Sequence, residues 1–151
     1  MGYDIQLNKE NDDARIREGA MVSDLPRGGQ FAVYESNRPL TDGDLEFYCT
    51  FNYAWYFYQT FEGGDGMKGL NGKTTDEAMP ILEAARKKIA VMEDIERKTG
   101  KVLSETWGKG GDFDDKSDNY WAVSAKNAGK AVDKLMDFCK LAPGYTFTVF
   151  A

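Results

Sequence analysis

The chain lacks the residue type that most often performs acid–base catalysis near neutral pH. It contains no histidine, the commonest general base near neutral pH and the usual partner of a catalytic serine or cysteine. Its two cysteines, Cys49 and Cys139, are far apart and lack the spacing of a zinc site or a redox pair. We therefore expect reduced, buried thiols, no catalytic residues, no cofactor and no enzyme activity.

Four aspartates in a polar loop over residues 101–121 form a candidate site for a hard metal ion, because calcium and magnesium bind carboxylate oxygens. They are Asp112, Asp114, Asp115 and Asp118. Their spacing does not fit the EF-hand loop, which needs acids at alternate positions, a central glycine and a distal glutamate. We interpret the segment as a solvated loop, although its spacing alone does not decide whether it binds metal. A metal-dependent hydrolase is the weakest of the function classes considered.

Glycine-rich and basic motifs for nucleotides are equally weak. The segments RGGQ, EGGDG and GKGG do not follow a strand and open a helix with the spacing of a phosphate-binding loop. Arg86, Lys87 and Lys88 make a short basic turn, which we interpret as the solvated face of a helix.

Length and charge limit the partners of this chain. Its 151 residues fit a single domain, and its net charge of −6 disfavours nucleic acid and anionic membranes. There is no apolar run of about 18 residues and no N-terminal signal pattern. We expect a cytoplasmic protein that binds neither membranes nor, directly, nucleic acids; its oligomeric state is not predicted.

The segment FYCTFNYAWYFYQTF, residues 47–61, has nine aromatic residues in fifteen, whereas the whole chain is 13% aromatic. As one strand it would be about three times the usual length. Asn52 is a good helix N-cap and Gly63-Gly64 a good stop, so we expect extended chain through Phe51 and a short helix from about Tyr53 to Glu62.

Most of these rings should fill the core, because each buried ring removes a large apolar area from water. A ten-residue helix cannot easily bury every side, and a phenol can keep its tip in water. We therefore expect an inward set of Phe51, Trp55, Phe57 and Phe61. The predicted partner-binding set faces outward beside an acidic turn and suits a basic partner: Tyr48, Tyr53, Tyr56, Tyr58, Asp42 and Asp44.

The spacing of apolar residues and the helix-capping residues predict the strands and helices that position these side chains. Alternation predicts strands at 3–7 and 145–150. A run of strand-forming residues between two turn-forming segments predicts another strand at 31–36. A capping box at Thr74 and Glu77 and a stop at Gly100 predict a helix over 75–98. Its apolar face repeats at spacings of three and four through Leu82, Ala85, Ile89 and Met92. Ser124 predicts the start of a second helix over 125–141.

Strands near both ends with helices between them predict an α+β fold. We expect a small, mainly antiparallel sheet covered by two longer helices and one short aromatic helix. Residues 1–151 form one domain, in which 8–40 read as an insertion.

Five segments together carry a resemblance: MGYDI, FNYAW, LNGKTTDEAMPILEAA, NYWAVSAKNAGKAVDKLMDFC and a short C-terminal strand. Their order resembles that of a group of small proteins encoded by bacteriophages and prophages. These share an MGYDI-like strand, a Tyr-Asn segment, a Leu-x-Gly-x-Thr helix start and an Asn-x-Trp entry to the last helix. The resemblance implies a phage origin and a shared fold, and it supplies no catalytic residues.

We consider two main functions. The first is a non-enzymatic phage accessory protein that binds a host or viral protein, for example to inhibit a bacterial defence system. The alternative is a protein that binds or sequesters a small ligand such as a nucleotide, with tyrosines stacked on the base. The aromatic segment has no cation for the phosphates, so Lys68, Lys73 or Arg38 would have to provide it.

Overall fold

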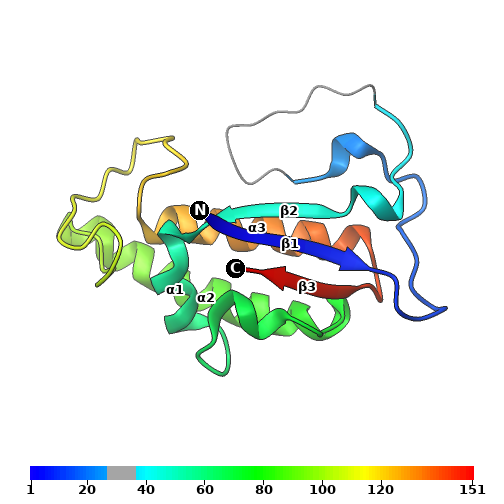
Figure 1. Cartoon of the computed structure of the whole chain (residues 1–151). Coiled ribbons are helices and arrows are strands. Elements are labelled where there is room, and N and C mark those ends of the chain that lie inside the picture. The colour runs from blue at the N-terminus through cyan, green and yellow to red at the C-terminus, as the bar shows by residue number, and fades with distance from the viewer. Residues whose placement is uncertain (27–36) are drawn as a thin grey trace.

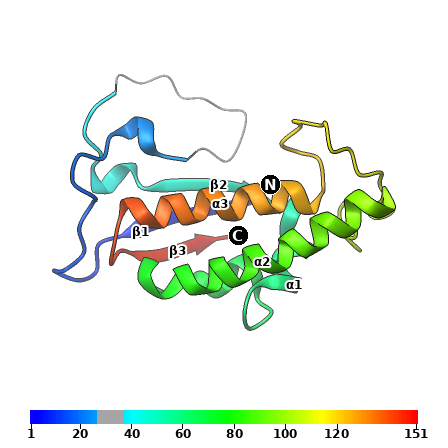
Figure 2. The same cartoon turned by 180° about the vertical axis from the view of Figure 1, so that it is seen from behind.

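The computed structural model describes residues 1–26 and 37–151. Within them a three-stranded antiparallel sheet packs on one face against two long helices, as Figure 1 and Figure 2 show from opposite sides. This arrangement confirms the predicted α+β class. The strand predicted at 31–36 lies outside the described residues.

The N-terminal strand lies in the middle of the sheet. β1 (Gly2–Asn8) pairs with β2 (Glu46–Thr50) on one side and with β3 (Thr146–Phe150) on the other, antiparallel to both. Tyr3, Ile5 and Leu7 of β1 are buried, while the residues between them point to the other face. The alternation in the sequence thus assigns one face of the sheet to the core.

The helix α2 (Thr75–Thr99) has the ends that its sequence predicts. Thr74 accepts a hydrogen bond from the backbone N–H of Glu77 at 3.2 Å, and the Glu77 carboxylate accepts one from the Thr74 N–H at 3.0 Å. Gly100 ends the helix with a φ of 74°, in the left-handed region.

The helix α3 (Ala125–Leu141) begins at Ser124, whose hydroxyl accepts a hydrogen bond from the Asn127 N–H at 3.1 Å. Arg86 of α2 reaches across to α3, where its Nε donates to the Asp133 carboxylate at 2.8 Å. The solvated interpretation of the basic run therefore holds for the exposed Lys87 and Lys88, and it is wrong for Arg86.

The aromatic segment leaves the sheet at Thr50 and forms a short helix, as predicted. A 3₁₀ turn over Phe51–Tyr53 leads from β2 into α1 (Ala54–Thr60). Asn52 is not the cap of this helix, because its side chain donates to the Trp121 carbonyl at 2.8 Å instead. Further 3₁₀ turns occur at Val22–Asp24, Asp42–Asp44 and Gly66–Leu70.

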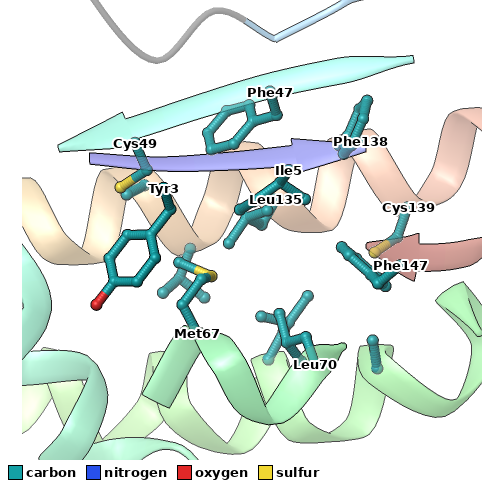
Figure 3. Close-up of a cluster of buried hydrophobic side chains, with 14 of the residues drawn as sticks. Tyr3, Ile5, Phe47, Cys49, Met67, Leu70, Leu135, Phe138, Cys139 and Phe147 are labelled. Carbon is teal, nitrogen blue, oxygen red and sulfur yellow. The ribbon is translucent and has the colours of Figure 1, made fainter. Parts of the chain in front are cut away.

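The core lies between the sheet and the helices. Figure 3 shows Ile5 and Phe47 of the strands on the same side as Leu135 and Phe138 of α3. The rings of Phe47 and Phe138 have centroids 5.9 Å apart. Met67 and Leu70, from the 3₁₀ turn that precedes α2, are fully buried below the sheet.

The connection between α2 and α3 is the long polar loop that the sequence predicts. Residues 100–124 contain no helix or strand, apart from an isolated bridge between Lys101 and Asp112. Both ends of the loop are held by contacts described below.

Candidate functional site

The face of the sheet that points away from the helices carries a row of two aromatic rings and an acid. Tyr48 of β2 and Phe150 of β3 both lie opposite Asp4 of the central strand. Asp4 is exposed, Tyr48 is half-buried, and Phe150 exposes 51% of its surface. Glu46 is exposed on the same face. We call Asp4, Glu46, Tyr48 and Phe150 the open face; no described element covers it in Figure 1.

The open face has only negative charge. None of the three strands contains a lysine or an arginine. Burial and then the neighbouring Asp4 raise the pKa of the Tyr48 hydroxyl, because both disfavour a phenolate. A Cβ at Gly2 would lie 2.5 Å from the Tyr48 oxygen. Glycine at this position therefore allows Tyr48 to lie across the central strand.

The predicted acidic turn is present, but its carboxylates have structural partners. Asp44 accepts two hydrogen bonds from Arg38, at 2.6 and 2.7 Å, and a third from the Thr41 N–H at 2.9 Å. The Arg38 guanidinium is the main reason that the pKa of Asp44 lies well below its usual range. Asp42 accepts a hydrogen bond from the Tyr145 hydroxyl. Burial and then Asp42 raise the pKa of Tyr145 to about 12.

The outward prediction for Tyr53 and Tyr56 is wrong. Their exposed fractions are 1% and 0%. Each hydroxyl donates to an acceptor within the protein, so neither needs contact with water. Tyr53 donates to the Tyr120 carbonyl and Tyr56 to the Glu96 carboxylate. Tyr58 does face outward, with 42% of its surface exposed.

The structure therefore does not gather the predicted set into one patch. Along the chain, Asp42 and Asp44 precede β2 and Tyr58 follows it on α1. Tyr48 lies within β2, on the open face. Of the predicted residues, Tyr48 is the one that belongs to the open face.

The inward set is confirmed for two of its four rings. Phe57 and Phe61 are buried, with centroids 5.3 Å apart. Phe51 and Trp55 are half-buried at the edge of the core. The Phe51 ring packs edge-on against Tyr3 at 4.7 Å. Most of the aromatic segment thus serves the core.

A buried carboxylate connects the helices with the loop. Glu96 of α2 is 0% exposed and accepts three hydrogen bonds. Its donors are the Tyr56 hydroxyl, the Leu103 N–H at 2.8 Å and the Ala125 N–H at 2.8 Å. Leu103 and Ala125 stand near the two ends of the polar loop, so one carboxylate fixes both. Sequence reasoning missed Glu96, although it continues the spacing from Ile89 and Met92 onto the apolar face.

A small pocket lies where β2, the polar loop and α3 meet, on the helix side of the sheet. Its volume is about 120 Å³. Buried Phe47, Cys49, Tyr53 and Ala131 form an apolar floor. The polar lining comes from the loop and from α3: Asp118, Tyr120, Asn127, Lys130 and Lys134.

Sequence reasoning also missed the two pocket lysines. Lys68, Lys73 and Arg38, which the nucleotide hypothesis requires, do not line this pocket. Lys130 and Lys134 are one turn apart on α3, a spacing that the sequence shows, but their position beside β2 depends on how the helix packs. The pocket is also smaller than the roughly 300–1,000 Å³ that holds larger ligands, which does not favour a complete nucleotide.

The cysteines are buried, and two acids of the polar loop have basic partners. Both cysteines are buried free thiols, and burial raises the pKa of Cys139 to about 12. Asp112 pairs with Lys101, and Asp115 accepts a hydrogen bond from Arg97 at 3.0 Å. Among the described residues, no three acidic or cysteine side chains gather into a group that could hold a metal ion.

Comparison of the chain with protein-family models, curated proteins and solved structures finds no match. In the described part of the chain, no helix combines the length and the apolar character needed to cross a membrane.

Proposed function

We propose that this protein is a non-enzymatic binding module whose open face docks on a basic surface of another protein. The observation that carries the proposal is the row of Tyr48, Asp4 and Phe150 across three strands that contain no basic residue. Carboxylates attract lysine and arginine, and aromatic rings add cation–π contacts with the same side chains.

The composition of the open face supports protein binding over a purely solvated surface. Exposed aromatic residues are enriched at binding hot spots, because they bury much area and lose little side-chain entropy. Neither the Asp4 nor the Glu46 side chain has a hydrogen bond or an ion pair with another described residue. Their charges are therefore available to a partner.

The resemblance to phage and prophage proteins suggests where this partner is found. We infer a host or viral protein met in the host cytoplasm, and a component of a bacterial defence system is one concrete form. Inhibition would then follow from occupation of a basic functional surface, without any chemistry by this chain.

Capture from host lysate with matched charge variants tests the proposal. Asp4→Lys and Phe150→Ser alter the open face, whereas Glu83→Lys makes the same charge change at an exposed position on α2. We expect at least one captured protein whose affinity falls roughly tenfold or more with Asp4→Lys and Phe150→Ser. Glu83→Lys should retain it, and added salt should weaken the complex.

The proposal fails if the open-face variants retain every captured protein, or if Glu83→Lys loses the same proteins equally. The first result would mean that binding uses another surface. The second would mean that capture depends on net charge alone.

A further inference from the structure

The pocket between β2 and α3 contains polar groups that the protein itself leaves without a partner. Within the described residues, neither the Lys130 nor the Asp118 side chain has an ion-pair or hydrogen-bond partner. Both are exposed, so they form the rim above the buried floor. Lys134 already has a partner within the protein, which makes Lys130 the principal cation of the pocket.

Tyr120 adds a directed donor to this rim. Its oxygen accepts a hydrogen bond from the Thr50 N–H at 2.9 Å, and its own O–H is used by no other described residue. A phenol held in this way can donate to an acceptor in the pocket. A tyrosine already carries its hydrogen at neutral pH, and burial raises the pKa of Tyr120 further.

The wall that carries Tyr120 is held in place before any ligand arrives. Asn127 donates both hydrogens of its amide group, to the carbonyls of Asn119 at 2.9 Å and Ala122 at 2.8 Å. On the other side Asn52 donates to the Trp121 carbonyl at 2.8 Å. A site built in this way binds without a large ordering cost.

The volume and charge of the pocket define the ligand. A cavity of about 150 Å³ is known to hold benzene, so 120 Å³ suits a body close to the size of one ring. Lys130 is the lining cation left for a ligand, because Lys134 already has a partner within the protein. One such cation suits a monoanion, whereas a dianionic phosphate would meet Asp118 and gain nothing from the apolar floor.

We propose that this pocket binds a small organic carboxylate with a flat apolar body. The body lies on the floor formed by Phe47 and Ala131, and the carboxylate accepts hydrogen bonds from Lys130 and Tyr120. Asp118 disfavours a second negative charge. The site lies on the opposite side of the sheet from the open face, so it is independent of the protein-binding proposal.

A titration of the isotope-labelled protein with benzoate, followed by amide NMR spectra, tests this site. We expect shifts at Cys49, Tyr120 and Ala131 at ligand concentrations up to about 20 mM, the range expected for so small a ligand. Benzylamine, which has a similar size and the opposite charge, should bind more weakly. Shifts elsewhere only, or tighter binding of benzylamine, would overturn the proposal.

Three substitutions separate the roles of the rim residues. Lys130→Ala should weaken benzoate binding at least about fivefold, because it removes the unpaired cation. Lys140→Ala, at an exposed position of the same helix outside the pocket, should leave binding unchanged. Asp118→Asn should strengthen binding about twofold or more, since it removes a like charge. Unchanged affinity in Lys130→Ala, or weaker binding in Asp118→Asn, would contradict the proposed orientation.

Discussion

Polar side chains on the two sides of the sheet differ in whether they have hydrogen-bond partners within the protein. On the helix side, the hydroxyls of Tyr53 and Tyr56 and the carboxylate of Glu96 all have hydrogen-bond partners within the protein. On the open face, the carboxylates of Asp4 and Glu46 have none among the described residues.

This difference separates residues that hold the fold from residues that are free to act. A buried polar group is costly unless it is paired, so its partner must be built into the protein. An exposed polar group needs no such partner and can be offered to another molecule. Chemical type alone therefore does not identify a functional tyrosine or aspartate in this chain.

The largest loss of stability should follow from replacement of Glu96, whose carboxylate accepts three hydrogen bonds on the helix side. Glu96→Ala leaves two backbone N–H groups and the Tyr56 hydroxyl without their acceptor, at about 1–3 kcal/mol for each group. We expect a loss of at least about 3 kcal/mol in the free energy of unfolding, measured by urea denaturation. Glu83→Ala, at an exposed site of the same helix, should change it by less than about 0.5 kcal/mol.

A loss in Glu96→Ala no larger than that of the Glu83→Ala control would contradict this account. It would mean that water replaces the carboxylate at little cost. The difference between the two sides of the sheet would then be much smaller than the hydrogen bonds indicate.

The second prediction compares two tyrosines of the same short helix. Tyr56→Ala should lower the free energy of unfolding by about 3–5 kcal/mol, because it leaves a large cavity and removes a donor to Glu96. Tyr58→Ala should lower it by only about 1–2 kcal/mol, since Tyr58 is 42% exposed and loses mainly a hydrogen bond with the Tyr3 hydroxyl. Thermal or urea unfolding of both variants provides the measurement.

This pair also tests the interpretation of the aromatic segment directly. Equal losses in the two variants would show that the exposed side of α1 is as important for packing as its buried side. Little loss in either would show that the segment is not core.

Regular elements of this fold are well predicted from the sequence, because their signals are local. The capping box at Thr74 and the left-handed stop at Gly100 define α2, and Ser124 defines the start of α3. Alternating apolar residues define β1 and β3. Each signal depends on neighbours within a few positions, which the chain order contains.

The candidate site is less predictable, because its contacts join distant parts of the chain. Tyr56 meets Glu96 forty positions away, and Tyr53 meets Tyr120. The residues near Tyr56 in the sequence do not indicate that its hydroxyl will donate to a buried carboxylate. Among these residues, Glu96 had a local signal, since the helical spacing placed it on the apolar face.

The third prediction concerns alkaline pH, where loss of the Tyr145 proton should lower the stability of the fold, because the phenol then no longer donates to Asp42. The pKa of Tyr145 is raised to about 12 in the folded protein, from about 10 in an unfolded chain. The folded state therefore favours the neutral phenol. The contribution is fully present below pH of about 10, and it is lost as the pH rises toward about 12.

This contribution to the free energy of unfolding is at most about 3 kcal/mol, because the pKa rises by about two units and each unit corresponds to roughly 1.4 kcal/mol. Denaturation of the wild type and of Tyr145→Phe from about pH 8 to about pH 12 measures it. The variant should lose less stability over this range, since phenylalanine has no proton to release. Parallel curves for the two proteins would rule out Tyr145 as a source of the alkaline loss, and other buried tyrosines would then have to account for it.

The smallest effect on stability should come from the open face. Asp4→Asn and Phe150→Ser change residues that are exposed and make no hydrogen bond through their side chains with the described part of the chain. We expect each to alter the free energy of unfolding by less than about 0.5 kcal/mol. Phe150 lies at the end of an edge strand, so its truncation leaves no enclosed cavity.

A loss above about 1.5 kcal/mol in Phe150→Ser would mean that this ring packs on Asp4 and Tyr48 as part of the fold. The open face would then resemble the helix side, and weaker partner binding by the variant would reflect damage to the sheet. A small loss together with weaker binding separates the two explanations, because only a surface that the fold does not need can change a complex while leaving stability intact.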